Sequence, residues 1–155
     1  MDALTPTAEG RAAARLVAQK TLLAHAVTDA LYAERPELLE RYGETGRARC
    51  LEDLHYTLEH LIPAVDLGEP ELFATYVRWL DALLRARGVP TREVVRCLEL
   101  VEAEARARFA PDEAEAVADV LRSLQLVERE VRAQFPDDEA DAVASYVRAG
   151  MEVVA

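Results

Sequence analysis

A cysteine and an aspartate stand about one helical turn apart in a segment whose apolar residues repeat with helical spacing. Cys50 and Asp53 both lie within residues 45–66. A projection at 100° per residue places Cys50 on one stripe with Leu54, Thr57, Leu58 and Leu61. Asp53 falls at the border of that stripe. Removing a carboxylate from water costs several kcal/mol unless a partner compensates it, so the sequence predicts a partner for Asp53.

Two kinds of partner for Asp53 stay open. Arg49, four residues earlier, would form an ordinary helical ion pair worth a few tenths of a kcal/mol. The alternative is a ligand rich in N–H groups that lies over Cys50 and Asp53. Tyr56 and His60 share the flank of the helix on which Arg49 and Asp53 lie. The positions expected to face solvent are Glu52, His55 and Glu59.

Prolines and glycines divide the chain into helical segments. Most prolines stand at or just before the start of a charged, apolar-periodic segment, where the missing N–H costs nothing, and Gly68 and Gly88 are predicted left-handed caps. Apolar residues at spacings of three and four, with no period-two strand pattern, predict an all-α fold of six to seven helices. The predicted helices are residues 8–34, 45–66, 71–87, 91–109, 112–134 and 137–153.

Three of these segments carry the clearest apolar stripes, which predict the core. The stripe residues are Leu16, Leu23, Val27 and Leu31, then Phe73, Val77, Leu80 and Leu84, then Val94, Leu98, Val101 and Ala105. The chain has 155 residues, close to the typical size of one domain, and no linker or repeat divides it. We therefore expect residues 1–155 to form a single domain.

Composition excludes several classes of partner. The chain holds 18 basic and 29 acidic residues, a net charge of −11, which argues against binding nucleic acid or an anionic membrane. No apolar run is long enough to span a bilayer, and the N-terminus has no secretion signal, so a cytoplasmic location is expected. The two cysteines are expected to be free thiols.

The chain has a Tyr42-Gly43 pair before Cys50, followed by Asp53 and Tyr56. This arrangement resembles the bilin-attachment segment of phycobiliproteins. Those proteins carry a Tyr-Gly pair eight and seven residues before the attachment cysteine, then Cys-x-Arg-Asp and a Tyr three residues after the Asp. Residues 31–37 and 87–90 are similar to two further segments of the family. The resemblance covers roughly residues 20–127.

The resemblance implies a globin-like fold of the phycobiliprotein type that holds a linear tetrapyrrole (bilin), such as biliverdin or phycocyanobilin, without catalysis. Cys50 would form a thioether to ring A, and Asp53 would accept hydrogen bonds from the pyrrole nitrogens. Arg49 would pair with a propionate, and Tyr56 would border the far end of the chromophore. The predicted cofactor-binding set is completed by Tyr42, Thr57, His60 and Trp79.

The chain also departs from the family pattern. Glu52 replaces an arginine that usually binds a propionate. Few residues precede the Leu31 segment, so the N-terminal hairpin used in antenna assembly is expected to be shortened, and a helix after Val127 is expected to be extra. Among phycobiliprotein-like globins, the chain is expected to be most similar to those associated with bilin biosynthesis in non-photosynthetic bacteria.

Other kinds of site are less well supported by the sequence. Glu52-x-x-His55 is half of a di-iron motif, and a second copy is absent. His25 or His60 would have to serve as the proximal ligand of a haem globin. A catalytic Cys50 would need a nearby base, and His60 is nearly three turns away, so an enzyme is not expected.

The rival interpretation is a ligand-free or haem-binding globin that signals as a homodimer. Asp53 would then pair with Arg49, and the helix of Trp79 would form the dimer seam.

Overall fold

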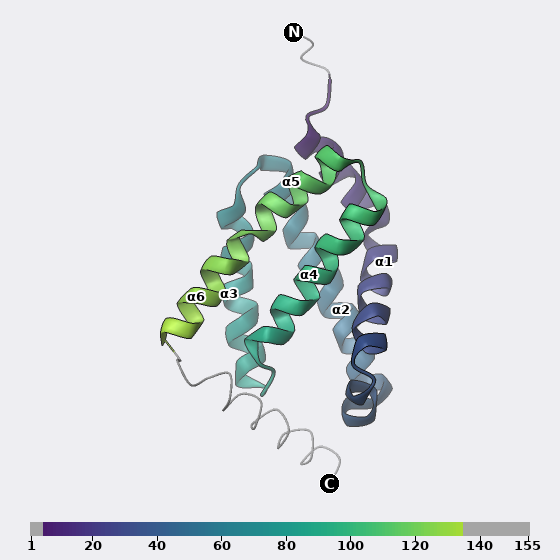
Figure 1. The fold of residues 1–155 in the computed structure, drawn as a ribbon, viewed down its shortest axis with the longest axis vertical. Helices are drawn as coiled ribbons and strands as arrows, with labels where there is room; N and C mark the ends of the chain where they lie inside the picture. Colours follow the sequence, from purple (N-terminus) through teal and green to yellow (C-terminus); the bar gives the residue numbers. More distant parts are fainter. Residues whose placement is uncertain (1–4, 135–155) are drawn as a thin grey trace.

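The computed structural model describes residues 5–134, which form six α-helices joined by short turns (Figure 1). The helices are α1 (Ala8–Glu34), α2 (Glu37–Leu67), α3 (Pro70–Ala86), α4 (Thr91–Arg108), α5 (Pro111–Leu121) and α6 (Ser123–Gln134). No strand occurs in this range, which confirms the prediction of an all-α fold.

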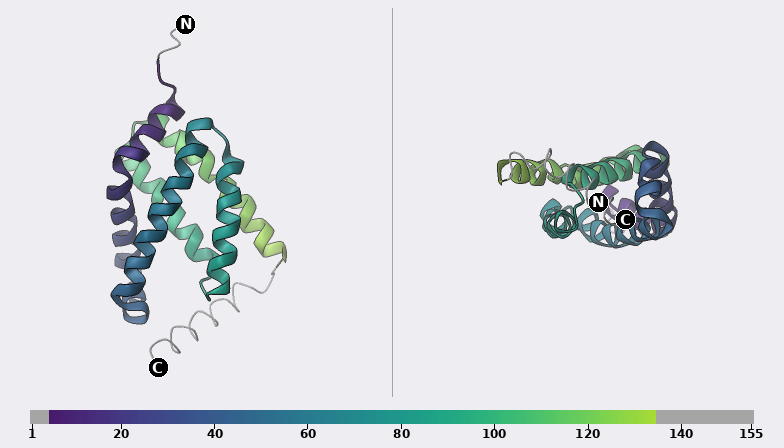
Figure 2. Two further views of the ribbon diagram at one scale, coloured as in Figure 1. Left: turned by 180° about the vertical axis from the view of Figure 1, so that it is seen from behind. Right: turned by 90° about the horizontal axis from the view of Figure 1, so that it is seen from below.

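The helices form two layers. Seen from behind, α1, α2 and α3 run side by side in alternating directions, and α4 with α5 and α6 covers their other face (Figure 2). α1 contacts α2, α4 and α5, and α3 contacts α2, α4, α5 and α6. The core lies between the layers, where five helices each contribute a side chain at most 2% exposed: Leu16, Leu58, Phe73, Leu98 and Val117.

The predicted apolar stripes form this core. Every stripe residue is buried except Leu84, which is partly buried against the core. Gly68 and Gly88 have the positive φ angles of 61° and 84° that their prediction as left-handed caps requires.

The structure differs from the predicted helices in two places, and one predicted helix lies outside the described residues. α2 begins at Glu37, ahead of the helix predicted at 45–66, and Gly43 breaks the helical backbone close to that predicted start. The helix predicted at 112–134 is divided at Arg122. There the Ser123 hydroxyl donates to the Val120 carbonyl at 2.6 Å and competes with the helical hydrogen bond. The helix predicted at 137–153 falls beyond residue 134.

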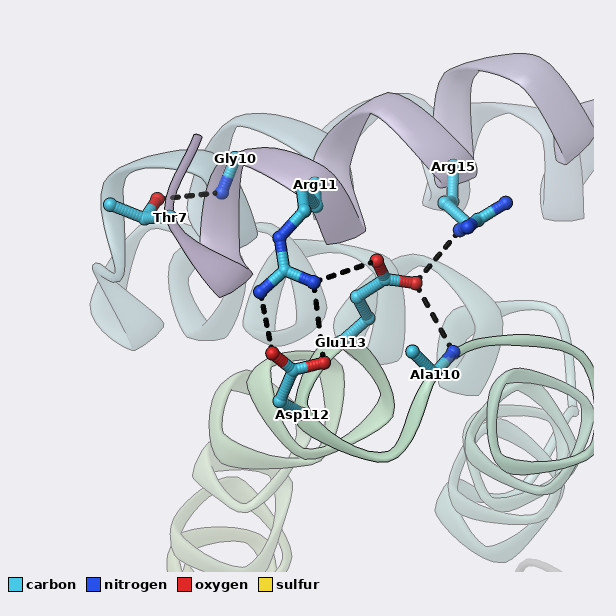
Figure 3. Close-up of polar contacts among 7 residues, drawn as sticks. All are labelled: Thr7, Gly10, Arg11, Arg15, Ala110, Asp112 and Glu113. Atoms are coloured by element: carbon cyan, nitrogen blue, oxygen red, sulfur yellow. Dashed lines mark hydrogen bonds and ion pairs between the residues drawn. The ribbon is translucent and has the colours of Figure 1, made fainter. Parts of the chain in front are cut away.

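A buried carboxylate joins the first helix to the fifth (Figure 3). Glu113 on α5 is 2% exposed and accepts hydrogen bonds from Arg15 at 2.8 Å, Arg11 at 3.2 Å and the Ala110 N–H at 3.1 Å. Arg11 also binds the exposed Asp112. Burial raises the pKa of Glu113, but the Arg15 and Ala110 hydrogen bonds and the two guanidinium charges together lower it below its ordinary value. We name these residues the α1–α5 clamp.

Candidate functional site

The helical segment that carries Cys50 starts at a glycine with a special backbone conformation. Gly43 has φ 64° and ψ −167°, a region essentially restricted to glycine, although a side chain there would have open space. Gly46 is needed for a different reason: an added Cβ would lie 2.3 Å from the Cβ of Tyr42. Together the two glycines let the chain change direction while Tyr42 packs partly buried against the core.

Cys50 of α2 is partly buried and packs against the core. The side chains of Cys97 on α4 and Thr28 on α1 and the charge of Arg47 lower the pKa of the Cys50 thiol, whereas burial and the charge of Asp53 raise it, and the net shift is downward. A lowered pKa increases the fraction of thiolate, the nucleophilic form of cysteine.

Asp53 is half-buried, and its side-chain carboxylate makes no ion pair or hydrogen bond within residues 5–134. Burial raises the pKa of its carboxyl. Arg87, in the turn after α3, is the cation that most strongly opposes this rise; Glu52 adds to the rise, and Arg49 opposes it more weakly. Asp53 is thus a carboxylate withdrawn from water whose charge the described residues compensate only in part.

An aromatic row connects α2 to α3 beside Asp53. The Thr57 hydroxyl lies 3.0 Å from the Tyr76 hydroxyl, and the His60 ring stacks on the Tyr76 ring at 4.1 Å between centroids. Trp79 is 60% exposed, with its ring 6.0 Å from that of Tyr76. Burial raises the pKa of Tyr76, the Thr57 hydrogen bond lowers it, and the charge of Asp53 raises it. The charge of Asp53 therefore acts on the Tyr76 hydroxyl of this row.

The predicted residues fall into two groups. Cys50, Asp53, Thr57, His60 and Trp79 belong to the neighbouring α2 and α3 side chains just described, among which Thr57 is buried, and Tyr42 lies at the glycine-rich start of that α2 segment.

Tyr56 is 51% exposed and lines an open hollow of about 370 Å³ on another face of α2. The other lining residues of that hollow are Ala48, Leu51, Glu52, His55 and Glu59. Arg49 is exposed.

One simpler interpretation of these residues is wrong. No ion pair joins Arg49 to Asp53 in the described chain, so Asp53 lacks the partner that the rival interpretation assigned to it.

Three residues of this region were missed by the sequence reasoning. Tyr76 shares its apolar stripe with Phe73, so its spacing is that of a core residue, and only packing brings its hydroxyl to Thr57. Cys97 also has core spacing, and nothing in the sequence places it against Cys50. Arg87 follows the last turn of α3, and no local pattern relates it to Asp53.

The family model described as phycobilisome protein matches residues 5–149. The chain belongs to this family. The predicted globin-like fold of the phycobiliprotein type is thereby confirmed. A search of the curated proteins and a search of the solved structures each gave no match. The narrower likeness to globins associated with bilin biosynthesis stays a prediction.

The match also corrects the predicted extent of the resemblance. Roughly residues 20–127 were expected, and the helix after Val127 was expected to be extra. The family model continues to residue 149, so the last part of the chain belongs to the family pattern as well.

Membership in the phycobilisome protein family suggests a bilin-binding chromophore protein. Proteins of this family are generally non-enzymatic pigment carriers, and membership implies a linear tetrapyrrole ligand and oligomeric assembly. In the described part of the chain, no helix has the length and apolar composition needed to cross a membrane. No cluster of three or more metal-ligating side chains occurs there either.

Proposed function

We propose that the protein binds a linear tetrapyrrole over the surface formed by Cys50, Asp53 and the aromatic row, and that Cys50 holds it by a thioether. The observation that carries the proposal is the state of Asp53: a half-buried carboxylate with no ion pair or hydrogen bond in residues 5–134, beside a thiol of lowered pKa. A bilin supplies a conjugated pigment that absorbs visible light and presents several N–H donors.

Asp53 has the chemistry to accept those donors. A carboxylate forms charge-assisted hydrogen bonds with N–H groups, and these are roughly twice as strong as neutral ones. Such bonds would compensate the charge that burial disfavours, so the raised pKa of Asp53 would fall on binding. The match between Asp53 and a bilin depends on two properties. The bilin has N–H donors for the carboxylate oxygens, and those oxygens have no partner of their own in residues 5–134.

Cys50 has the chemistry to attach the pigment. Its sulfur adds to one carbon of a carbon–carbon double bond on ring A, so one C–S bond forms and one π bond breaks. The thiol proton goes to the neighbouring carbon, and no atom leaves. The neighbouring Cys97 and Thr28 side chains lower the pKa of the Cys50 thiol, which favours the reactive thiolate.

The remaining predicted residues would surround the pigment. His60 and Trp79 offer exposed aromatic surface on one side, and both rings lie against the buried Tyr76. Thr57 fixes Tyr76 through the 3.0 Å hydrogen bond. Arg49 is exposed at the edge, where a propionate would reach solvent.

Reconstitution of the purified chain with phycocyanobilin tests the proposal. We expect a red absorption band that survives acid-urea denaturation, because a thioether is not broken by unfolding. Cys50→Ala should lose the surviving band, whereas the matched variant Cys97→Ala should keep it.

Other outcomes separate the alternatives. A band that washes out in urea would show that Cys50 is a contact and not an anchor. No spectral change with phycocyanobilin or biliverdin would overturn bilin binding, and a Soret band after addition of haem would favour the haem-globin interpretation.

The biological role and setting are part of the same proposal. The protein would carry the bilin, sequester it, or use it to sense light. It would act as a single domain in the cytoplasm, and a homodimer would be its simplest assembly. Sedimentation with and without bilin measures the oligomeric state.

A further inference from the structure

α3 presents a second stripe of uncharged residues to solvent, on the side opposite its core residues. α3 lies at the edge of the layer formed by α1, α2 and α3 (Figure 2). Six residues of α3 are exposed, and Glu71 is the only charged one among them. The other five follow one another at intervals of three and four residues: Leu72, Thr75, Trp79, Ala82 and Ala86. We name these five residues the α3 seam.

The spacing of the α3 seam is the spacing by which helices pack against each other. Residues that alternate at intervals of three and four form the contact line of a coiled coil. Leu72 is 50% exposed and Trp79 is 60% exposed. A second helix packed along the seam would remove this apolar surface from water, which is favourable.

α2 widens the uncharged surface beside the seam. Its exposed residues Tyr56, His60, Pro63 and Leu67 are spaced by four, three and four, so they share one side of the helix. His60 joins this side to α3, because its ring stacks on the ring of Tyr76. Half of the large apolar side chains exposed in residues 5–134 therefore gather on these two adjacent helices: Tyr56, Leu67, Leu72 and Trp79.

We propose that this surface is the interface of a homodimer, in which the α3 seams of two copies of the chain pack antiparallel about a two-fold axis near Val77. The inference concerns the chain without pigment and does not rest on the proposed function. Trp79 is also one of the residues proposed to surround the pigment. The experiments below therefore omit bilin, so that failure of the dimer and failure of bilin binding are separate results.

The sizes of the seam residues indicate that the partner is a second copy. In the antiparallel arrangement, residues equally far before and after Val77 face each other, which places Leu72 opposite Ala82 and Thr75 opposite Trp79. Each layer then combines a large side chain with a small one, so the two seams interdigitate. Every contact occurs twice, because a two-fold interface is self-complementary. A parallel arrangement in register would instead place Trp79 against its own equivalent.

The charged residues on one flank of the seam favour the same orientation. Glu71, Arg78 and Arg85 follow one another at intervals of seven residues. Antiparallel packing brings Glu71 of one copy near Arg85 of the other, whereas parallel packing would bring like charges together at all three positions. The two Arg78 side chains lie near the axis. Each is paired within its own chain with Glu71 at 2.6 Å and Glu130 at 3.0 Å, which reduces their repulsion.

The only tryptophan of the sequence reports on this interface directly. Sedimentation velocity of the full chain from nanomolar to high micromolar concentration should show monomers converting to dimers. Over the same range the emission of Trp79 should shift to shorter wavelength, because the dimer removes its ring from water. A monomer at every concentration would overturn the inference, and so would a dimer that leaves the emission unchanged, because its interface would lie elsewhere.

Two leucines of similar exposure provide matched variants. Leu72 in the seam is 50% exposed, and Leu126 on α6 in the other layer is 52% exposed. Leu72→Gln should raise the Kd of the dimer at least about tenfold, because both copies lose a buried leucine. Leu126→Gln should keep the Kd within about twofold. Circular dichroism checks that both variants fold. Equal Kd values for the two variants would contradict the proposed interface.

Cross-linking tests the orientation. In a background with Cys50→Ala and Cys97→Ala, the substitutions Leu72→Cys and Ala82→Cys each introduce one thiol. Oxidation of an equal mixture of the two chains should give covalent dimers, because positions 72 and 82 face each other across the axis, whereas either chain alone should give none. Covalent dimers from the Ala82→Cys chain alone, or none from the mixture, would overturn the antiparallel arrangement.

Discussion

Glu113 and Asp53 are two of the carboxylates that the described part of the chain withdraws from water, and the fold treats these two in opposite ways. Glu113 in the α1–α5 clamp receives hydrogen bonds from two arginines and a backbone N–H, and its pKa is lowered. Asp53 on α2 is half-buried, makes no ion pair or hydrogen bond within the described chain, and has a raised pKa.

The difference separates a structural carboxylate from one available to a ligand. The partners of Glu113 come from α1 and from the start of its own helix, so its charge helps to hold the two helices together. The charge of Asp53 is only partly compensated by more distant arginines, of which Arg87 contributes most. A ligand with N–H donors would supply Asp53 with hydrogen bonds of the kind that Glu113 receives from the protein itself.

The largest effect is expected from neutralising the clamp. Glu113→Gln removes a buried charge and leaves Arg11 and Arg15 without their shared partner. We expect Tm, measured by circular dichroism, to fall by about 5–10 °C. Asp112→Asn is the matched control, because Asp112 is 53% exposed, and it should change Tm by less than about 2 °C. A Tm for Glu113→Gln equal to that of wild type would refute the role given to the clamp.

The same kind of substitution at Asp53 should act on binding instead of stability. Asp53→Asn should leave Tm unchanged or slightly higher, since it removes a charge that burial disfavours. In a Cys50→Ala background, where binding is reversible, it should weaken bilin affinity about 10–100-fold, because charge-assisted hydrogen bonds are lost. We also expect a blue-shifted band. Unchanged affinity and spectrum would contradict the role of Asp53.

The two carboxylates should also respond to pH with opposite signs. The pKa of Glu113 lies below 4.5, so its contribution to stability is present above pH 4.5 and is lost as pH falls through its folded value. The pKa of Asp53 lies above 3.8, so the protonated form of Asp53 favours folding. This contribution is lost as pH rises through the pKa of Asp53 in the folded protein.

Bilin binding needs the charged form of Asp53. Affinity in the Cys50→Ala background should therefore weaken by up to about tenfold per pH unit as pH falls through the pKa of Asp53, which lies above 3.8. In the double variant with Asp53→Asn this dependence should vanish. A fluorescence titration over a pH series measures both, and a persisting dependence in the double variant would assign the effect to another group.

The smallest effect is expected from the hydrogen bond that supports the aromatic row. Thr57→Val keeps the shape of the side chain but leaves the Tyr76 hydroxyl without its 3.0 Å partner. This should cost about 1 kcal/mol, or about 2–4 °C in Tm. Thr75→Val, at an exposed position of α3, is the control and should have no measurable effect. Equal Tm values for the two variants would show that the Thr57 hydrogen bond adds nothing.

Much of the fold could be predicted because local rules define where most helices begin and end. Gly68 and Gly88 end two helices, and the apolar stripes identified the core with Leu84 as the one partly buried member. The prediction missed the helical residues of α2 that precede the break at Gly43, and it missed the division at Arg122, where a short-range Ser123 hydrogen bond interrupts a continuous apolar pattern.

The candidate site could be predicted only along one helix. Cys50, Asp53 and Thr57 belong to the same few turns of α2, so helical geometry alone relates them. Cys97 and Tyr76 come from α4 and α3, and their spacing is that of ordinary core residues. Their contacts with Cys50 and Thr57 depend on tertiary packing, which spacing along the chain does not reveal.

The most direct test of the central claim is the titration of the Asp53 carboxyl, followed by carbon-13 NMR in the free protein and in the phycocyanobilin complex. We predict a pKa above 3.8 in the free protein and a clear fall when the pigment binds. A pKa at or below 3.8 without ligand would mean that the protein already compensates this carboxylate. An unchanged value in the complex would mean that the pigment does not contact it, and either result would contradict the account.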